Sequence, residues 1–142
     1  MSDRFHQTPN WQPIAMLPVI AQLIDGGLSD TQEQYQTLQQ AQGRSYTLDD
    51  DTIRRVIKFA NEQKEFLHIY AEQLTRWKTE KLSAAQKLEI ERLEQQLVKF
   101  RELNTTILAL VDQLKEQTIE KFLAKSDEEI GLEFLLGKLN FQ

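Results

Sequence analysis

The sequence predicts an all-α protein, and three observations lead to this prediction. Glycine and proline, which most often end helices, are missing between Arg44 and Ile130, a stretch rich in Leu, Glu, Gln, Lys and Ala. Capping sequences of the form Ser/Thr-x-x-Glu/Gln, or close to it, begin at Ser29, Ser83 and Ser126. Apolar residues with 3-4 spacing then form a stripe on each side of Ser83. Together these features predict a helical bundle built on a long antiparallel, coiled-coil-like hairpin.

Glycines and capping signals divide the chain into five predicted helices. Gly26-Gly27 ends the first helix and Gly43 ends the second, while Thr47, followed by three aspartates, starts the third. Ser83 marks the turn between the two long helices, and three shorter helices are expected to pack around the open end of this hairpin. The predicted helices cover approximately residues 13–25, 30–42, 48–82, 84–125 and 127–138.

Both long helices carry an apolar seam that is interrupted by one polar residue. The interruptions, Gln63 and Asn104, lie at similar distances from Ser83. We therefore expect the two side chains to meet, hydrogen-bond to one another and fix the register of the hairpin. The seam residues are Ile53, Val56, Ala60, Gln63, Leu67, Tyr70, Leu74 and Trp77 on one helix, and Ile90, Leu93, Leu97, Phe100, Asn104, Ile107, Val111 and Leu114 on the other.

The hairpin is predicted to change in thickness along its length. Near its open end the apolar stripe is too wide for one partner helix to cover, so the shorter helices should pack there. Between residues 71 and 97 large apolar side chains become fewer, which predicts a two-helix arm with solvent on both sides. The sequence thus predicts a polar N-terminal tail over residues 1–12 and a single helical-bundle domain over 13–142, from which an arm projects at about 71–97.

Composition excludes several classes of protein. The net charge of −5 disfavours binding of nucleic acid or anionic lipid over the whole surface. Because the chain has no cysteine, it can form no disulfide, thiolate metal site or cysteine nucleophile. The most apolar run, residues 14–24, is far shorter than the ~20 residues of a membrane-spanning helix. The N-terminus also lacks the layout of a signal peptide, so we expect a cytoplasmic protein of bacterial type.

The turn of the hairpin carries a local excess of positive charge. Between residues 76 and 88, four cationic side chains face only Glu80, and a tryptophan lies among them. A projecting tip of this kind is suited to an acidic protein partner or a nucleic-acid backbone. The simpler interpretation is a solvated helical face around a core tryptophan. The candidate partner-binding residues are Arg76, Trp77, Lys78, Lys81 and Lys87.

Two pairs of carboxylates are candidates for a metal site. Glu62 and Glu65 lie three residues apart on the first long helix, and Glu91 and Glu94 have the same spacing on the second. This arrangement resembles the all-α nucleotide pyrophosphatases, and the resemblance implies that the four carboxylates hold Mg²⁺ against a nucleoside triphosphate. Glu94 stands where the pattern of that family has Asp, which puts the fourth ligand in doubt. Surface ion pairing is the ordinary role of such residues.

A second metal motif is incomplete. Glu65 and His68 have the E-x-x-H spacing that di-iron helical bundles use, but those sites need a second such motif. The only other histidine, His6, lies in the polar tail. Because Glu65 and His68 also fall on the outward side of the hairpin, the pattern favours an exposed helical face over a metal site.

No sequence motif specifies a reaction. The chain contains no G-x-S-x-G nucleophile elbow, no phosphate-binding loop and no dinucleotide fingerprint, so no catalytic residue or cofactor is predicted. We expect a non-enzymatic interaction, regulatory or scaffold module that binds a protein partner, or a second copy of itself, through the arm. The alternatives are a Mg²⁺-dependent hydrolase similar to the nucleotide pyrophosphatases and a nucleic-acid-binding module that uses the basic tip.

Overall fold

The structure, a computed structural model, describes residues 9–44, 48–118 and 123–124 of the chain. Three helices pack together: α1 (Leu17–Ala41), α2 (Asp50–Trp77) and α3 (Ala84–Leu114). One turn of 3-10 helix precedes α1 (η2, Ile14–Met16) and another follows α3 (η4, Lys115–Gln117). Regular structure in the described ranges is entirely helical, so the all-α prediction is confirmed.

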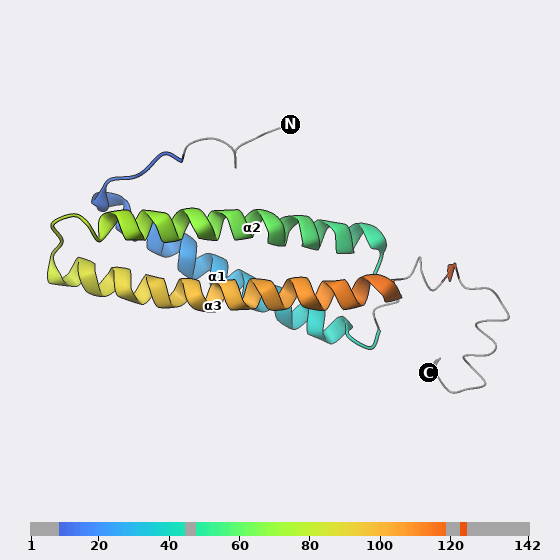
Figure 1. Cartoon of the computed structure of the whole chain (residues 1–142). Helices are drawn as coiled ribbons and strands as arrows, with labels where there is room; N and C mark the ends of the chain where they lie inside the picture. The colour runs from blue at the N-terminus through green and yellow to red at the C-terminus, as the bar shows by residue number, and fades with distance from the viewer. Residues whose placement is uncertain (1–8, 45–47, 119–122, 125–142) are drawn as a thin grey trace.

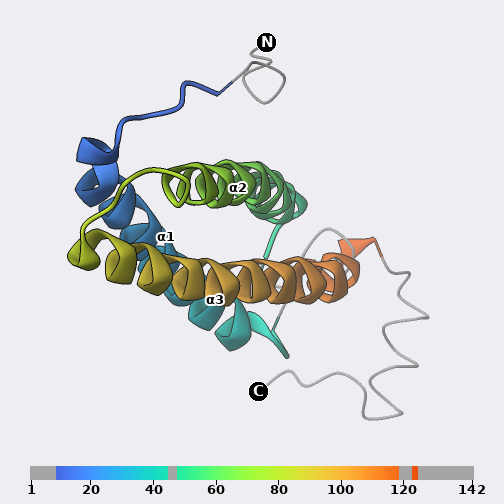
Figure 2. The same cartoon turned by 60° about the vertical axis from the view of Figure 1, so that its left-hand side comes forward.

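Helix α3 lies at the centre of the bundle, where it packs against both α1 and α2. α2 and α3 run antiparallel and are joined by the turn at residues 78–83, while α1 crosses α3 obliquely along most of its length (Figures 1 and 2). No helix in the described parts of the chain is both long and apolar enough to cross a membrane.

The prediction of two short helices at 13–25 and 30–42 is wrong, because α1 is one continuous helix of 25 residues. Gly26 and Gly27 lie inside it, and Ser29 caps no helix. A Cβ atom at Gly27 would lie 2.9 Å from Cε2 of the Phe100 ring, closer than carbon atoms approach one another. The glycine therefore lets α1 pack closely against α3. Gly43, with a φ angle of +90°, follows the end of α1 as predicted.

The start of α2 uses a different cap from the predicted one. The Asp49 carboxylate accepts a hydrogen bond from the Thr52 backbone N–H at 2.7 Å, and Asp50 and Asp51 occupy the first turn. Thr47, the predicted cap, lies outside the described residues. α2 ends at Trp77, several residues before the predicted end at 82.

The start of α3 is the capping box predicted at Ser83. The Gln86 N–H donates to the Ser83 hydroxyl at 3.1 Å, and the Ser83 N–H donates to the Gln86 side chain at 2.9 Å. The regular α-helix ends at Leu114, and η4 follows, so α3 is shorter than the predicted span of 84–125. The helix predicted at 127–138, with its cap at Ser126, lies outside the described residues.

The polar residues of the two seams have different partners from those predicted. Gln63 Nε2 donates to the Thr31 hydroxyl of α1 at 2.8 Å, and Asn104 Nδ2 donates to the carbonyl oxygen of Ala60 at 3.0 Å. The longer side chain, Gln63, reaches α1, because the continuous helix places a hydroxyl over this level of the hairpin. The shorter one, Asn104, bonds the nearest backbone carbonyl of the facing helix.

Apolar side chains are buried from one end of the bundle to the other, so residues 71–97 do not form a projecting arm. The N-terminal half of α1 packs against this segment, and Trp77 is fully buried. The physical reason is the length of α1: 25 residues span about 37 Å at ~1.5 Å per residue. The core at the turn end consists of Leu17, Ile20, Ala21, Ile24, Leu28, Leu67, Leu74, Trp77, Ile90, Leu93, Leu97 and Phe100. The core at the open end consists of Leu38, Ile53, Ile107, Leu110, Val111 and Leu114.

Candidate functional site

The five residues predicted to bind a partner do not form one surface. Trp77 lies in the core, and its indole Nε1–H donates to the carbonyl oxygen of Gln12 at 2.9 Å. The Arg76 guanidinium lies 4.2 Å from the centre of the Trp11 ring and is also close to the Glu72 carboxylate. Trp77 is therefore unable to contact a partner while the protein is folded.

The three remaining cations of the hairpin turn differ in whether they form an ion pair. Lys78 forms an ion pair with Glu94 at 3.1 Å, which joins the C-terminal end of α2 to α3. Lys81 and Lys87 are exposed, and neither forms an ion pair within the described residues. Leu88, next to Lys87, is 66% exposed. The turn thus offers a partner two lysines and one leucine, without the predicted aromatic side chain.

The two pairs of carboxylates lie at different levels of the hairpin. The Lys78–Glu94 ion pair and the Asn104–Ala60 hydrogen bond define which residues face one another. By this register, the pair at 62 and 65 is separated from the pair at 91 and 94 by roughly 15–20 Å along the helices, at ~1.5 Å per residue. No cluster of three or more His, Asp or Glu side chains that could hold a metal ion occurs within the described ranges. The four-carboxylate arrangement implied by the pyrophosphatase resemblance is not assembled.

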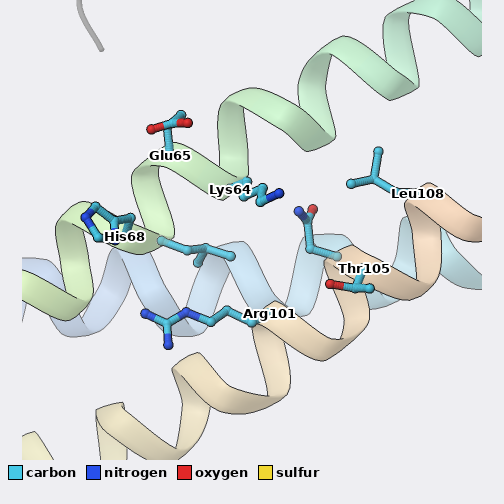
Figure 3. Close-up of a pocket in the computed structure, with 8 residues that line it drawn as sticks. Lys64, Glu65, His68, Arg101, Thr105 and Leu108 are labelled. Carbon is cyan, nitrogen blue, oxygen red and sulfur yellow. The ribbon is translucent and has the colours of Figure 1, made fainter. Parts of the chain in front are cut away.

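A groove of about 690 Å³ runs between α2 and α3 (Figure 3). Its floor includes Leu67 and Asn104, which are 2% and 4% exposed, together with the half-buried Leu108. Lys64 and His68 on α2 and Arg101 and Thr105 on α3 form its rim. The lining residues are Lys64, Glu65, Leu67, His68, Arg101, Asn104, Thr105 and Leu108.

The groove lies on the side of the hairpin that faces away from α1. Gln63 and Phe100 contact α1, through the hydrogen bond to Thr31 and the close approach to Gly27. The groove residues Lys64 and Arg101 each follow one of these positions by a single residue. One residue turns an α-helix by about 100°, which moves the side chain away from the α1 side. Figure 3 accordingly shows α1 passing behind the two helices that form the groove.

The groove carries a local excess of positive charge on a chain of net charge −5. Lys64 and Arg101 are exposed, and neither has an ion-pair or hydrogen-bond partner within the described parts of the chain. Glu65 is the one carboxylate at the rim. Two cations thus lie beside a mainly apolar floor, with a single carboxylate at the rim. Glu65 and His68 are exposed, as predicted from their outward position on the hairpin, and both line this groove.

On the α1 side, one cluster of charged residues connects two helices. Arg92 on α3 makes two hydrogen bonds to the Asp25 carboxylate of α1, at 3.0 and 2.8 Å, and two to Glu89. The hydrogen bonds from Arg92 lower the pKa of Asp25 and the pKa of Glu89 below their ordinary values. Gln96 donates a further bond to Asp25 at 3.0 Å. This cluster is a structural connection between α1 and α3 and leaves no cation available to a ligand.

Sequence reasoning missed the groove for a specific reason. Lys64 and Arg101 directly follow seam positions. The 3-4 spacing therefore places them at a border of the buried stripe and says nothing more about them. Which border is covered depends on the side of the hairpin that α1 takes, and periodicity contains no information on that choice. Comparison of the chain with models of protein families, with curated proteins and with solved structures gave no match.

Proposed function

We propose that this protein is a non-enzymatic interaction module whose hairpin, α2 and α3, binds an acidic amphipathic helix of a protein partner in the groove between the two helices. The observation that carries the proposal is a mainly apolar floor beside two cations, Lys64 and Arg101, that have no partner among the described residues. An amphipathic helix places its apolar face in such a groove, and carboxylates at its edges can meet the cations at the rim.

The dimensions of the groove favour a short helix. Arg101 and Leu108 are seven positions apart on α3, which corresponds to about 11 Å, or roughly two helical turns. Two turns present two or three apolar side chains on one face, which matches the small floor made by Leu67 and Leu108. An interface of this size is suited to weak and reversible binding.

The turn of the hairpin supports an interaction function less well than the groove does. Its tryptophan is buried, and Arg76 and Lys78 already contact Glu72 and Glu94. Lys81 and Lys87 remain exposed. Two charges neutralise few phosphates, so nucleic acid would bind only weakly at the turn. The hydrolase alternative is not proposed, because its carboxylates are not brought together.

The proposal is tested with a fluorescein-labelled synthetic helix that has leucines on one face and glutamates along its edges. Binding to the full chain is measured by fluorescence anisotropy. The groove variant is Lys64→Glu/Arg101→Glu, and the matched control is Lys81→Glu/Lys87→Glu, which changes the net charge by the same amount. We expect the groove variant to bind about tenfold more weakly, or ~1.4 kcal/mol, and the control to bind like the parent.

Equal weakening in the two variants would show that the peptide responds only to net charge, and would contradict the proposed site. A peptide of the same composition in scrambled order provides the second control. Equal binding of the scrambled peptide would also contradict the proposal, because a charged surface without a groove does not require an amphipathic helix. Tighter binding of a DNA oligonucleotide than of the peptide, with steep salt dependence, would favour the nucleic-acid alternative instead.

A further inference from the structure

The residues that follow Thr118 include a segment with the chemistry that the groove selects. Within the helix predicted at 127–138, the first turn is acidic, with Asp127, Glu128 and Glu129, and a further carboxylate follows at Glu133. Leucines then recur with the i, i+3, i+4, i+7 spacing of one face of an α-helix. This stripe consists of Leu132, Leu135 and Leu136 within the predicted helix, and Leu139 directly after it.

The segment begins within reach of the groove. Thr118 is buried, and its hydroxyl donates to the carboxylate of Asp50, so the chain passes the start of α2 at the open end of the hairpin. Leu108, the groove residue closest to that end, precedes Leu114 by six positions, or about 9 Å of helix. The eight residues from 119 to 126 can span up to ~26 Å at ~3.3 Å each. Residue 127 can therefore lie at the near end of the groove.

The length and charge of the segment also match the groove. A helix of twelve residues is about 18 Å long and covers the roughly 11 Å between the levels of Leu108 and Arg101. With residue 127 at the near end, Glu133 comes to the level of Lys64 and Arg101, which lack partners in the described residues. The three carboxylates of the first turn, Asp127, Glu128 and Glu129, lie nearer the level of Leu108. With α1 on the opposite side of the hairpin, a helix in the groove would complete a four-helix arrangement and run antiparallel to α3.

We propose that the chain's own acidic segment, residues 127–138, occupies the groove between α2 and α3 and that a partner helix binds by displacing it. This inference rests on the proposed function of the groove and adds its regulation: the protein carries an internal competitor for its own binding site. A tethered segment competes at a high effective concentration, so its displacement sets the affinity that a partner must have.

Cross-linking of engineered cysteines tests the position of the segment directly. The chain contains no cysteine, so each introduced pair reports on one distance only. In the test variant, Thr105→Cys at the groove is combined with Glu133→Cys. In the matched control, Thr37→Cys on the exposed surface of α1 is combined with the same Glu133→Cys. Disulfide formation requires Cα atoms within about 7 Å, so the two variants distinguish the two sides of the hairpin.

We expect the groove pair to form an intramolecular disulfide under mild oxidation at low protein concentration, several-fold faster than the control pair. Non-reducing electrophoresis and mass spectrometry measure the product. Equal rates in the two variants would overturn the inference, because the segment would then have no preferred side. A disulfide that forms only between two molecules would also overturn it and would identify a second copy of the chain as the occupant.

A binding measurement separates failure of this inference from failure of the proposed function. The tail variant Leu135→Ser/Leu136→Ser removes part of the apolar stripe, and we expect it to bind the labelled acidic peptide several-fold more tightly than the parent does. An intramolecular disulfide without peptide binding by the tail variant would contradict the proposed function and leave the segment as a structural fourth helix. Peptide binding without the intramolecular disulfide would contradict only the internal competitor.

Discussion

The two faces of the α2–α3 hairpin differ in what their polar side chains do. On the face covered by α1, Gln63 bonds Thr31, and Arg92 bonds Asp25, so these groups connect helices. On the opposite face, Lys64 and Arg101 stand beside an apolar floor without a partner in the described residues. Both faces are built from the same two helices, and many of their residues are neighbours in the sequence.

The comparison teaches where to look for function in a chain without a catalytic motif. Polar groups that satisfy one another across a helix interface stabilise the fold and are not available to a ligand. Cations that remain unpaired beside apolar surface keep their capacity for charged partners. The turn of the hairpin has more cations in its sequence than the groove, but Trp77, Arg76 and Lys78 there already contact other parts of the protein.

The largest expected effect is on the covered face. Trp77→Ala removes a fully buried indole and the hydrogen bond from its Nε1 to Gln12, so we expect it to lower the free energy of unfolding by about 3–5 kcal/mol. Urea unfolding followed by circular dichroism measures the change. Trp11→Ala is the control, since its half-buried ring contacts Arg76 at the surface and its loss should cost about 1 kcal/mol.

The result for Trp77 also decides between the two views of residues 71–97. A loss close to that of the Trp11 control would mean that the tryptophan is not packed against α1. In that case the segment would project as the sequence suggested, and the turn of the hairpin would again be the better candidate for a binding surface.

The parts of the fold that sequence reasoning predicted correctly are those that local chemistry determines. The capping box at Ser83 satisfies backbone groups within its own turn, so its position in the sequence is enough to place the start of α3. The eight seam residues of α3 are all buried, because a 3-4 spacing of apolar residues defines one face of a helix whatever packs on it.

The parts that were predicted wrongly depend on tertiary contacts. Gly26-Gly27 followed by Ser29 has the local pattern of a helix end and a new N-cap, but the helix continues, and the close approach of Phe100 gives Gly27 a packing role instead. The groove likewise follows from the side on which α1 packs. Lys64 and Arg101 therefore could not be distinguished from other surface cations before the three helices were placed together.

A matched pair of glycine substitutions tests the close contact between α1 and α3 at Gly27. Gly26 has open space around its Cα, so Gly26→Ala should raise the free energy of unfolding by about 0.5–1 kcal/mol through helix propensity. Gly27→Ala gains the same propensity but places a methyl group 2.9 Å from the buried Phe100 ring. Overpacking of this kind costs about 1–3 kcal/mol, so we expect no gain or a net loss.

Urea unfolding of the two variants provides the measurement, with the parent chain as reference. Equal stabilisation by both substitutions would show that the Phe100 ring moves aside without cost, and that Gly27 does not set the distance between α1 and α3.

The smallest expected effect concerns the polar cluster on the covered face and its dependence on pH. The hydrogen bonds from Arg92 hold the pKa of Asp25 below its ordinary value of 3.8. The unfolded chain therefore binds a proton more readily than the folded chain in acid. The contribution of Asp25 to stability is present above the unfolded value and is lost as the pH falls through the lower folded value.

We expect Asp25→Asn to cost about 1 kcal/mol or less at neutral pH, because both partners are partly exposed, and to reduce the loss of stability below about pH 4. Urea midpoints measured at a series of pH values for Asp25→Asn, Arg92→Gln and the double variant complete a double-mutant cycle. Once Arg92 is absent, the Asp25 substitution should alter the acid dependence much less, since the largest cause of the pKa shift has been removed and only the hydrogen bond from Gln96 remains. If it alters that dependence equally in both backgrounds, Arg92 is not the group that lowers the pKa of Asp25. The Arg92–Asp25 pair would then contribute little to the connection between α1 and the hairpin, which would depend on apolar packing and on the hydrogen bonds of Gln63 and Gln96, and the contrast between the two faces would be weaker than the structure indicates.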